Sequence, residues 1–202
     1  PIQSGANSIL KRMSRRCKTE TFADLVKEAR KYVANFNVTT DVIVGFPGES
    51  DDEFQQSLDF VASQPFGHIH IFSYSDREGT KAATLPNKVD KEVKKSRSKA
   101  LHQLAEKLKK QQLLEQVGQT VEVLWEGTYQ QLENGKRRYL GYTPNYHKVQ
   151  LDLEAKFSIE RKVVDTKLTD VSDNNQLIGF IPNELLNAFP LENSPEINIK
   201  QL

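Results

Sequence analysis

One nine-residue stretch, from Asp41 to Glu49 (DVIVGFPGE), constrains the fold of this chain more than any other. Its β-branched residues 42–44 are followed at once by two glycines and a proline, which is typical of a buried strand that ends in a tight turn. Ser50 and Glu53 then fit a capping box, so a helix is expected to begin there. In a parallel α/β sheet or barrel, ligands bind where such a strand ends. The turn is therefore the first candidate site.

The turn does not fit a phosphate-binding loop. It lacks the GxxxxGK[ST] pattern, and residues 49–53 carry four carboxylates that would repel a phosphate at the start of the helix. Gly45 and Gly48 have no Cβ, so the backbone there can approach a flat ligand closely. A plain strand-to-helix connection has the same pattern and stays open as the alternative.

Helical and strand patterns alternate around this turn. Apolar residues recur at helical spacing over 19–35 and 51–63, and β-type runs occupy 38–44 and 68–72. A short helix is expected to precede them, with Asn7 as its N-cap. Strand, helix and strand at this spacing predict two parallel strands joined by a right-handed crossover, as in an α/β fold.

A long polar helix is predicted over 90–116. Between Lys88 and Lys110, nine Lys and Arg residues stand against three Asp and Glu, a net charge of +6. This basic stretch could support RNA binding, but an ordinary solvated helix face would have the same composition.

The pattern changes after Gly118. Short β runs separated by turn residues predict a small closed barrel. The five runs are 119–125, 138–141, 146–151, 163–171 and 176–181. We therefore expect an α/β domain over 1–118, a barrel over 119–182, and a loosely held tail over 183–202.

Composition excludes several classes of protein. The 28 Lys and Arg residues balance 27 Asp and Glu, so bulk charge argues neither for nor against nucleic acid. Cys17 is the only cysteine, which excludes a disulfide framework and a CxxC metal site, and it is best interpreted as a surface thiol. No apolar run approaches a membrane span and no signal peptide is visible, so a soluble cytoplasmic protein without a membrane partner is expected.

Polar side chains on the predicted strands are the candidates for chemistry. Asp41 shares a strand face with Ile43 and Gly45. An inward carboxylate at a ligand-binding end is costly unless it is paired or functional, so Asp41 is the candidate catalytic residue. His68 and His70 share a face two residues apart, but no third ligand is near. A hydrogen-bonded structural role is expected for them in place of a metal site.

Cations and aromatic residues are interleaved in the predicted barrel. They are Lys136, Arg137, Arg138, Tyr139, Tyr142, Tyr146 and Lys148. On a small β-barrel this combination suits RNA, because cations hold the backbone and rings stack on bases. From 119 to 182 eight Lys and Arg stand against nine Asp and Glu, so only a local patch is expected. The alternative is an ordinary hairpin tip.

Four motifs, in this order and at this spacing, resemble the radical S-adenosylmethionine methylthiotransferases. They are Pro1-x-Gln3-Ser4-Gly5, Leu10-x-x-Met13-x-Arg15, Asp41-x-Ile43-Val44-Gly45-Phe46-Pro47-Gly48-Glu49 and Phe72-x-Tyr74-Ser75-x-Arg77-x-Gly79-Thr80. The long helix and the five-strand module resemble the TRAM domain of that family, so the resemblance covers residues 1 to about 181. Glu78 and Lys81 stand where the family usually has proline, which bears on the rigidity of that loop and not on the fold.

The resemblance implies the second half of a partial (β/α) radical SAM barrel, followed by a small OB-like TRAM barrel. S-adenosylmethionine would bind at the open strand end, over a 4Fe–4S cluster. The implied cofactor-binding residues are Gln3, Ser4, Arg15, Ile43, Gly45, Phe46, Gly48 and Glu49. Gln3 and Ser4 would lie near the ribose, Ile43 and Gly45 would pack on the adenine, and Arg15 would reach the carboxylate.

The cysteines that ligate the radical cluster and a second, sulfur-donating cluster are expected upstream of Pro1. With Cys17 alone the chain is expected to hold no cluster and to be catalytically inert by itself.

The resemblance also implies a substrate. Segments 40–45 and 68–75 and the loop residue Arg77 look most like the subgroup that adds a 2-methylthio group to N6-threonylcarbamoyladenosine beside the tRNA anticodon. The implied substrate and RNA contacts are Arg77, Lys136, Arg137, Arg138, Tyr142 and Lys148. The implied partners are tRNA and a protein that reduces the cluster. Alternatives are the subgroups acting on isopentenyladenosine in tRNA or on a ribosomal-protein aspartate, and a non-catalytic RNA-binding protein.

Overall fold

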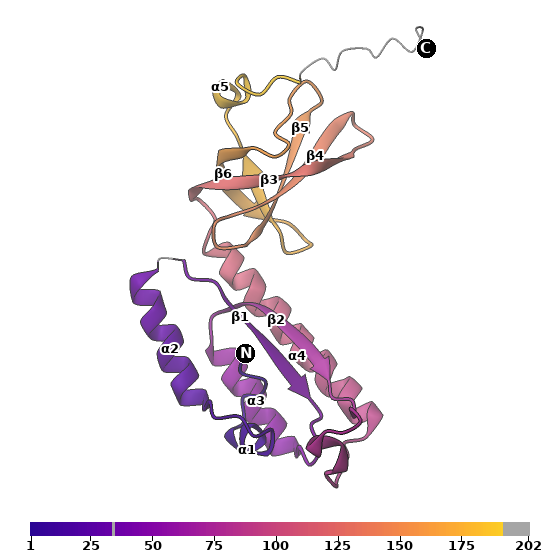
Figure 1. Cartoon of the computed structure of the whole chain (residues 1–202). Helices are drawn as coiled ribbons and strands as arrows, with labels where there is room; N and C mark the ends of the chain where they lie inside the picture. Colours follow the sequence, from indigo (N-terminus) through magenta and orange to yellow (C-terminus); the bar gives the residue numbers. More distant parts are fainter. Residues whose placement is uncertain (34, 192–202) are drawn as a thin grey trace. The chain divides into compact units, whose positions relative to one another are not determined.

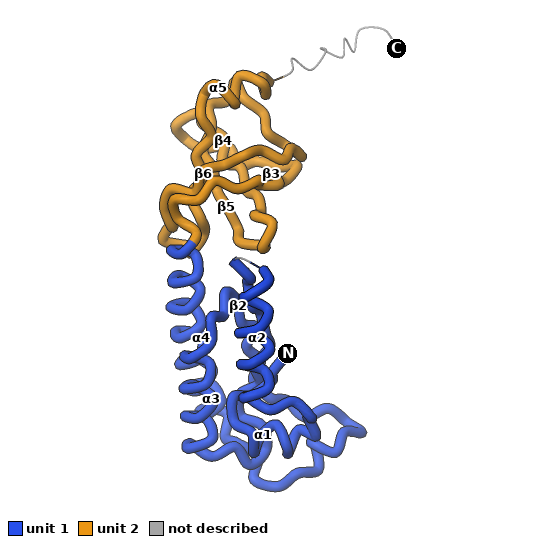
Figure 2. Tube along the Cα trace, turned by 90° about the vertical axis from the view of Figure 1, so that its left-hand side faces the viewer, with its two compact units in different colours: residues 1–115 blue, residues 116–202 orange. Residues whose placement is uncertain are grey.

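The computed structural model describes residues 1–33 and 35–191. The chain divides into two compact units, Pro1–Glu115 and Gln116–Leu202, which are coloured separately in Figure 2. Each unit encloses buried apolar side chains of its own. No helix in the described ranges is long and apolar enough to cross a lipid bilayer.

Unit 1 is an α/β unit built on two parallel strands (Figure 1). Its elements are α1 (Asn7–Arg12), α2 (Thr19–Tyr32), β1 (Val38–Val44), α3 (Asp51–Ser63), β2 (Phe66–Ser73), η1 (Lys81–Thr84) and α4 (Lys91–Leu114). β1 and β2 pair in parallel with α3 as their connection, which confirms the predicted strand–helix–strand unit. On the other edge of β1, Gln3 forms a parallel bridge to Val42.

Two helix starts show what local sequence can and cannot predict. Ser50 and Glu53 form the predicted capping box of α3. Asn7 does not cap α1, which has no side-chain cap. Its side-chain oxygen instead accepts a hydrogen bond of 3.0 Å from the backbone N–H of Thr19, at the start of α2. The prediction for Asn7 was wrong because this contact joins residues that are distant in sequence.

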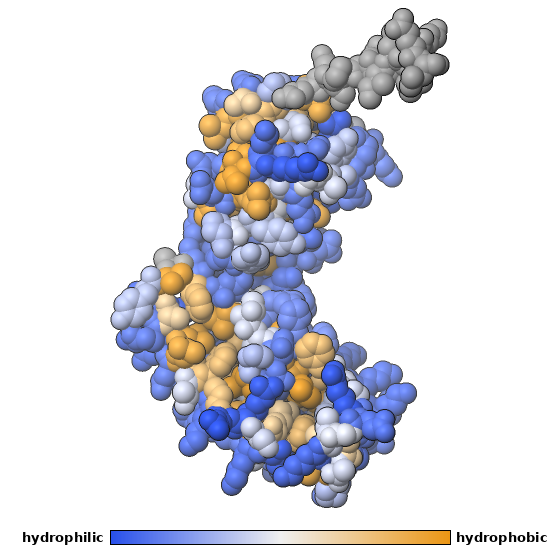
Figure 3. Space-filling model, viewed as in Figure 1, coloured by the Kyte–Doolittle hydropathy of each residue, from blue (hydrophilic) through white to orange (hydrophobic). Residues whose placement is uncertain are grey.

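The two faces of the sheet are unequal. Val42 and Val44 are buried, whereas Asp41 and Ile43 on the opposite face are half-buried. Helices α2, α3 and α4 cover the buried face, to which they contribute Val26, Val61, Leu101 and Leu108. Figure 3 shows hydrophobic side chains gathered over α2 and the neighbouring sheet. The face that carries Asp41 is the one left for a ligand.

Unit 2 is a closed five-stranded barrel, as predicted. Its strands are β3 (Thr120–Gln131), β4 (Lys136–Tyr142), β5 (Lys148–Glu154), β6 (Val163–Val171) and β7 (Leu177–Phe180). They are ordered β3-β4-β5-β7-β6, and β5 pairs with β7 in parallel. Trp125 and Tyr139 are the largest side chains in the barrel core.

The start of the predicted loose tail is folded. Helix α5 (Asn183–Leu186) follows β7, and its Leu186 is buried. Pro190 forms a bridge with Phe157, and the N–H of Leu191 donates to the oxygen of Lys156. The buried side chain of Leu186 and backbone hydrogen bonds therefore hold this segment on the barrel. The rest of the predicted tail, 192–202, lies outside the described residues.

Candidate functional site

The open face of the sheet carries the predicted catalytic residue, Asp41. In the strand register Asp41 lies beside His70, and His68 and Phe72 extend the row along β2. The rings of His68 and His70 meet edge to face with centroids 4.5 Å apart. Burial lowers the pKa of His68, and the charges of His70 and Lys109 lower it further. Within the described ranges neither imidazole has the expected hydrogen bond, so ring contacts replace that structural role.

An apolar platform lies at the carboxyl end of the sheet. Ile43 pairs there with Phe72, whose side chain is 53% exposed. Gln3 lies beside them, and its backbone oxygen accepts a hydrogen bond of 2.8 Å from the N–H of Ile43. The φ angle of Gln3 is 71°, in the left-handed region that residues other than glycine rarely adopt. Such strain clusters at ligand sites, and the platform suits a flat ring.

A buried ion pair closes the turn between Gly45 and Glu49. The carboxylate of Glu49 accepts a hydrogen bond of 2.8 Å from the N–H of Gly45 and one of 2.7 Å from the guanidinium of Arg97 in α4. Burial raises the pKa of Glu49, against the opposing effects of Gly45 and Arg97. Arg97 also donates to the backbone oxygen of Glu49. Glu49 therefore shapes the turn from inside the protein.

The remaining residues of the turn are also packed. Phe46 is buried with its ring 5.2 Å from that of Tyr74. A Cβ on Gly45 would lie 2.2 Å from Cγ of Lys94, so the α4 side chain fills the space that the glycine leaves. The φ of Gly48 is 78°, a value that favours glycine. Both glycines are thus needed by the fold itself.

Two further residues of the implied cofactor set lie away from the platform. Ser4 is buried, and its hydroxyl lies 3.1 Å from that of Ser57 in α3. The side chain of Arg15 is exposed. It is Arg12 that reaches the turn, where it donates to the oxygen of Gly48 at 3.2 Å and pairs with Glu53.

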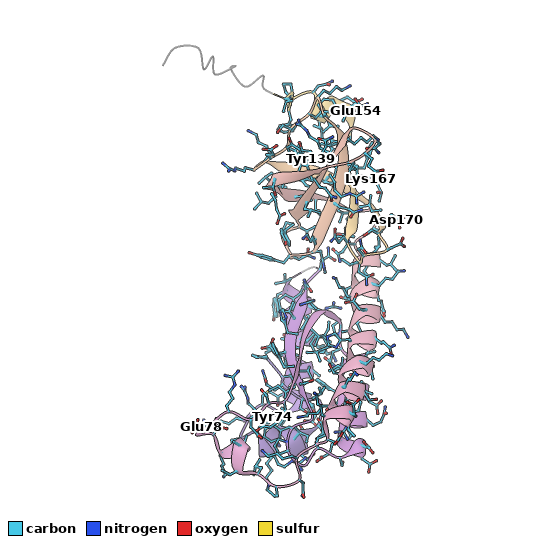
Figure 4. The ribbon with its side chains drawn as sticks, turned by 90° about the vertical axis from the view of Figure 1, so that its right-hand side faces the viewer. Tyr74, Glu78, Tyr139, Glu154, Lys167 and Asp170 are labelled. Atoms are coloured by element: carbon cyan, nitrogen blue, oxygen red, sulfur yellow. The ribbon has the colours of Figure 1, made fainter. Side chains whose placement is uncertain are left out.

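The loop that follows β2 is fixed by a lysine. Lys88 pairs with the carboxylate of Asp76, which also accepts a hydrogen bond of 3.0 Å from the hydroxyl of Tyr74. The hydrogen bond from Lys88 lowers the pKa of Asp76. Arg77 and Glu78 are exposed in this loop, and Figure 4 labels Tyr74 and Glu78. A fixed backbone thus presents the free guanidinium of Arg77 to solvent.

The predicted RNA-binding residues of the barrel do not form one patch. Lys136 and Tyr142 stand at opposite ends of β4, roughly 20 Å apart at the usual rise of a strand. Tyr139 between them is fully buried and cannot stack on a base (Figure 4). Arg138 is held by Asp152 through hydrogen bonds of 2.7 and 2.8 Å, so its charge is already paired.

A cation lies over an aromatic ring at each end of β4. The guanidinium of Arg137 lies 4.3 Å from the ring centroid of Tyr129, and the ammonium of Lys148 lies 5.9 Å from that of Tyr142. Tyr146, which is 82% exposed, lies beside Tyr142. Nε and Nη1 of Arg137 are buried, whereas the group around Lys148 includes the exposed ring of Tyr146.

Residues 1–61 match the model of the radical SAM superfamily. The chain is 40% identical over 149 residues to threonylcarbamoyladenosine tRNA methylthiotransferase MtaB of Bacillus subtilis, a match that covers 74% of this chain and 33% of that protein. It is 34% identical over 191 residues to ribosomal protein uS12 methylthiotransferase RimO of Clostridium botulinum, over 92% of this chain and 41% of the relative. The chain belongs to the radical SAM methylthiotransferase family. A third member, tRNA-2-methylthio-N(6)-dimethylallyladenosine synthase of Pelotomaculum thermopropionicum, is 43% identical over 127 residues, 63% of this chain and 28% of that protein.

The chain spans between 28% and 41% of the length of these three relatives. The α/β unit is the radical SAM region of the family, and the five-stranded barrel is consistent with its TRAM domain. Family membership implies S-adenosylmethionine and a 4Fe–4S cluster, and the residues of this chain can be compared with both groups.

The described residues differ in what they offer to these two groups. Ile43 and Phe72 form an apolar surface at the strand end on which a flat ring such as adenine would fit. Cys17 is exposed and alone, and no group of three or more His, Cys, Asp or Glu in the described ranges could hold a metal ion. The described residues therefore include an apolar surface suited to a flat ring and no group that could hold a metal ion.

Several residues at the site were missed by sequence reasoning. Phe72 was noted only as part of a motif, and its pairing with Ile43 depends on the strand register. Arg97 and Lys94 belong to the predicted basic helix, where nothing local indicates contact with the turn. Their i, i+3 spacing, which places both on one helix face, was the available signal.

Proposed function

We propose that this chain is part of a tRNA methylthiotransferase that adds a 2-methylthio group to N6-threonylcarbamoyladenosine next to the anticodon. The observation that carries this proposal is its 40% identity to the Bacillus subtilis protein MtaB across 149 residues, joined to the exposed Arg77 beside the strand end. The threonylcarbamoyl group is anionic, so a guanidinium on a fixed loop is suitable for holding it.

The residues of this chain would bind and orient the reactants. Ile43 and Phe72 would pack on the adenine of S-adenosylmethionine, with Gln3 beside them, while Arg97 and Glu49 keep the turn in shape. Bound together with a 4Fe–4S cluster, S-adenosylmethionine would supply radical chemistry at this surface. Asp41 lies on the same open face and would contact the substrate or the cofactor from the strand.

The barrel would hold the RNA. The pair Lys148–Tyr142 combines a cation with a ring, which suits phosphate contact and base stacking together. Because Arg138 is paired with Asp152 and the guanidinium nitrogens Nε and Nη1 of Arg137 are buried, this pair and Tyr146 would carry the interaction.

Deleting the gene in its host and analysing tRNA nucleosides by mass spectrometry tests the proposed substrate. We expect methylthio-threonylcarbamoyladenosine to disappear and the methylthio-isopentenyl product to remain. Loss of the isopentenyl product alone would assign the chain to the subgroup of the Pelotomaculum relative. A change confined to ribosomal protein uS12 would assign it to the subgroup of RimO.

A further inference from the structure

A polar trough crosses the outer face of the barrel, over strands β3, β4 and β5. It has a volume of about 320 Å³. The residues that line it are Thr128, Tyr129, Gln130, Arg138, Leu140, Gln150, Asn174 and Gln176. Four of these eight side chains are carboxamides, and the one charged group, Arg138, is paired with Asp152.

The strand register brings the carboxamides together. Gln130 of β3 pairs with Arg138 of β4, and Leu140 of β4 pairs with Gln150 of β5. Gln150 in turn pairs with Ile178 of β7, so Gln176, two residues earlier, shares its face. Asn174 lies in the turn between β6 and β7. Sequence alone does not place these carboxamides in one trough, because they come from two strands and the turn before β7.

The carboxamides are free to bind a ligand. Within the described part of the chain, the side chains of Gln130, Gln150, Asn174 and Gln176 have no hydrogen-bond partner in the protein. Each can donate and accept, as the edge of a nucleobase does. Leu140, which lies between Arg138 and Tyr142 on β4, supplies an apolar contact in the trough.

The trough has no unpaired charge among its described lining residues, so it offers little attraction for a phosphate. The guanidinium of Arg138 donates two hydrogen bonds to the oxygens of Asp152, at 2.7 and 2.8 Å, so its charge is paired. Outside the trough the ammonium of Lys148 lies 5.9 Å from the ring centroid of Tyr142. Nε and Nη1 of Arg137 are buried, so this guanidinium is not presented to a ligand. A strand of RNA along β4 would thus meet the cation of Lys148 at a phosphate and neutral hydrogen-bonding groups at one base.

We propose that this trough is a nucleobase-binding subsite, in which Gln130 and Gln150 hydrogen-bond the edge of one unpaired base that lies over Leu140. The inference rests on the proposed RNA-binding function of the barrel and names the part of the RNA that this surface reads. Carboxamides read base edges through paired donor and acceptor contacts, whereas contacts to phosphate carry no sequence information.

The test measures binding of the 202-residue chain to labelled rA6, rC6 and rU6 hexaribonucleotides by fluorescence anisotropy. Gln130→Met with Gln150→Met keeps the side-chain length and removes the polar groups. We expect the wild type to prefer one base and the double variant to lose that preference by about tenfold, with an unchanged dependence on salt. The matched control, Gln103→Met, changes an exposed carboxamide on α4 and should leave the preference intact.

A second variant separates this inference from the function on which it rests. Lys148→Ala should weaken binding of all three RNAs alike and reduce the salt slope by about 0.7, the value for one phosphate on a single strand. If the wild type binds without base preference, or if the double glutamine variant keeps its preference, the subsite is disproved while RNA binding stands. If the wild type binds none of the RNAs, the proposed RNA-binding function fails and the subsite fails with it.

Discussion

At the scale of single residues, the site depends on one buried charge pair. The side chains of Glu49 and Arg97 are both nearly inaccessible to solvent. The carboxylate of Glu49 also accepts a hydrogen bond from the N–H of Gly45. Removing one partner of such a pair leaves an uncompensated buried charge, which costs far more than the pair itself contributes. The shape of the turn therefore depends on a residue of α4 that lies outside the turn motif.

We expect Arg97→Met to lower the free energy of unfolding by about 3 kcal/mol, because Glu49 is then left charged and unpaired. Urea unfolding followed by circular dichroism measures this. The double change Arg97→Met with Glu49→Gln should recover part of the loss. Lys31→Met, which breaks the exposed pair with Glu28, is the matched control and should cost less than about 0.5 kcal/mol. A cost for Arg97→Met no larger than that of the control would contradict the assignment.

Sequence reasoning missed this pair for a physical reason. Local patterns report the spacing of residues along one element, and the capping box of Ser50 and Glu53 was predicted correctly because it spans a single turn. Glu49 and Arg97 are 48 residues apart and meet only after α4 has packed. The basic composition of α4 indicated a solvated face, and it did not reveal that one arginine of that face is buried.

At the scale of elements, the start of α3 is joined to α1 by a single carboxylate. Glu53 accepts hydrogen bonds from Arg12, from the hydroxyl of Ser8 and from the N–H of Ser50. Burial alone would raise the pKa of Glu53, but these hydrogen bonds outweigh it and lower the pKa to about 2. The helix start and the turn that precedes it are therefore sensitive to acid.

The sign of this pH dependence follows from the lowered pKa. Glu53 should stabilise unit 1 fully above pH 4.5, its unperturbed pKa, and lose that contribution as the pH falls toward about 2. Over this pH range we expect the unfolding free energy of Glu53→Gln to fall by about 1–2 kcal/mol less than that of the wild type. This figure allows for solvent screening at the half-exposed Arg12. Urea unfolding of both proteins between those pH values measures the difference. Parallel curves would show that the carboxylate is not coupled to folding.

The elements themselves were largely predictable, and their partners were not. β-branched runs gave β1 and the five barrel strands, but β3 continues to Gln131, beyond the predicted end at 125. A register shift between Trp125 and Tyr129 lets the strand bend and carry on, which simple alternation does not reveal. The same limit applies to the open face, because the pairing of Asp41 with His70 depends on strand register.

The open face of β1 and β2 allows a test of Asp41. This residue is half-buried and is not part of the apolar core, so we expect Asp41→Asn in the complete protein to change the unfolding free energy by less than about 0.5 kcal/mol. If it contacts the reactants, methylthio product per folded molecule should fall by more than about tenfold. Thr39→Val, an exposed change on the same face at the far end of the strand, is the control. Earlier melting with undiminished product would make Asp41 a structural residue.

At the scale of the whole molecule, the chain consists of two units with separate cores. The helices that dominate circular dichroism, α2, α3 and α4, all belong to unit 1. The single tryptophan, Trp125, is buried in unit 2. Each unit therefore has a spectroscopic signal of its own, and unfolding of the two can be followed in one sample.

We expect each unit to respond to its own core. Leu101→Ala, in α4, should lower the stability seen by circular dichroism by about 2–5 kcal/mol and leave the tryptophan transition in place. Leu168→Ala, in β6, should lower the stability seen by tryptophan fluorescence by a similar amount and leave the circular dichroism transition in place. The reason is that the side chain of Leu168 is equally buried in the barrel. Urea titrations that record both signals on the same samples measure this. If each variant shifts both transitions together, the two units unfold as one cooperative body, and the barrel cannot be treated as an independently stable RNA-binding module.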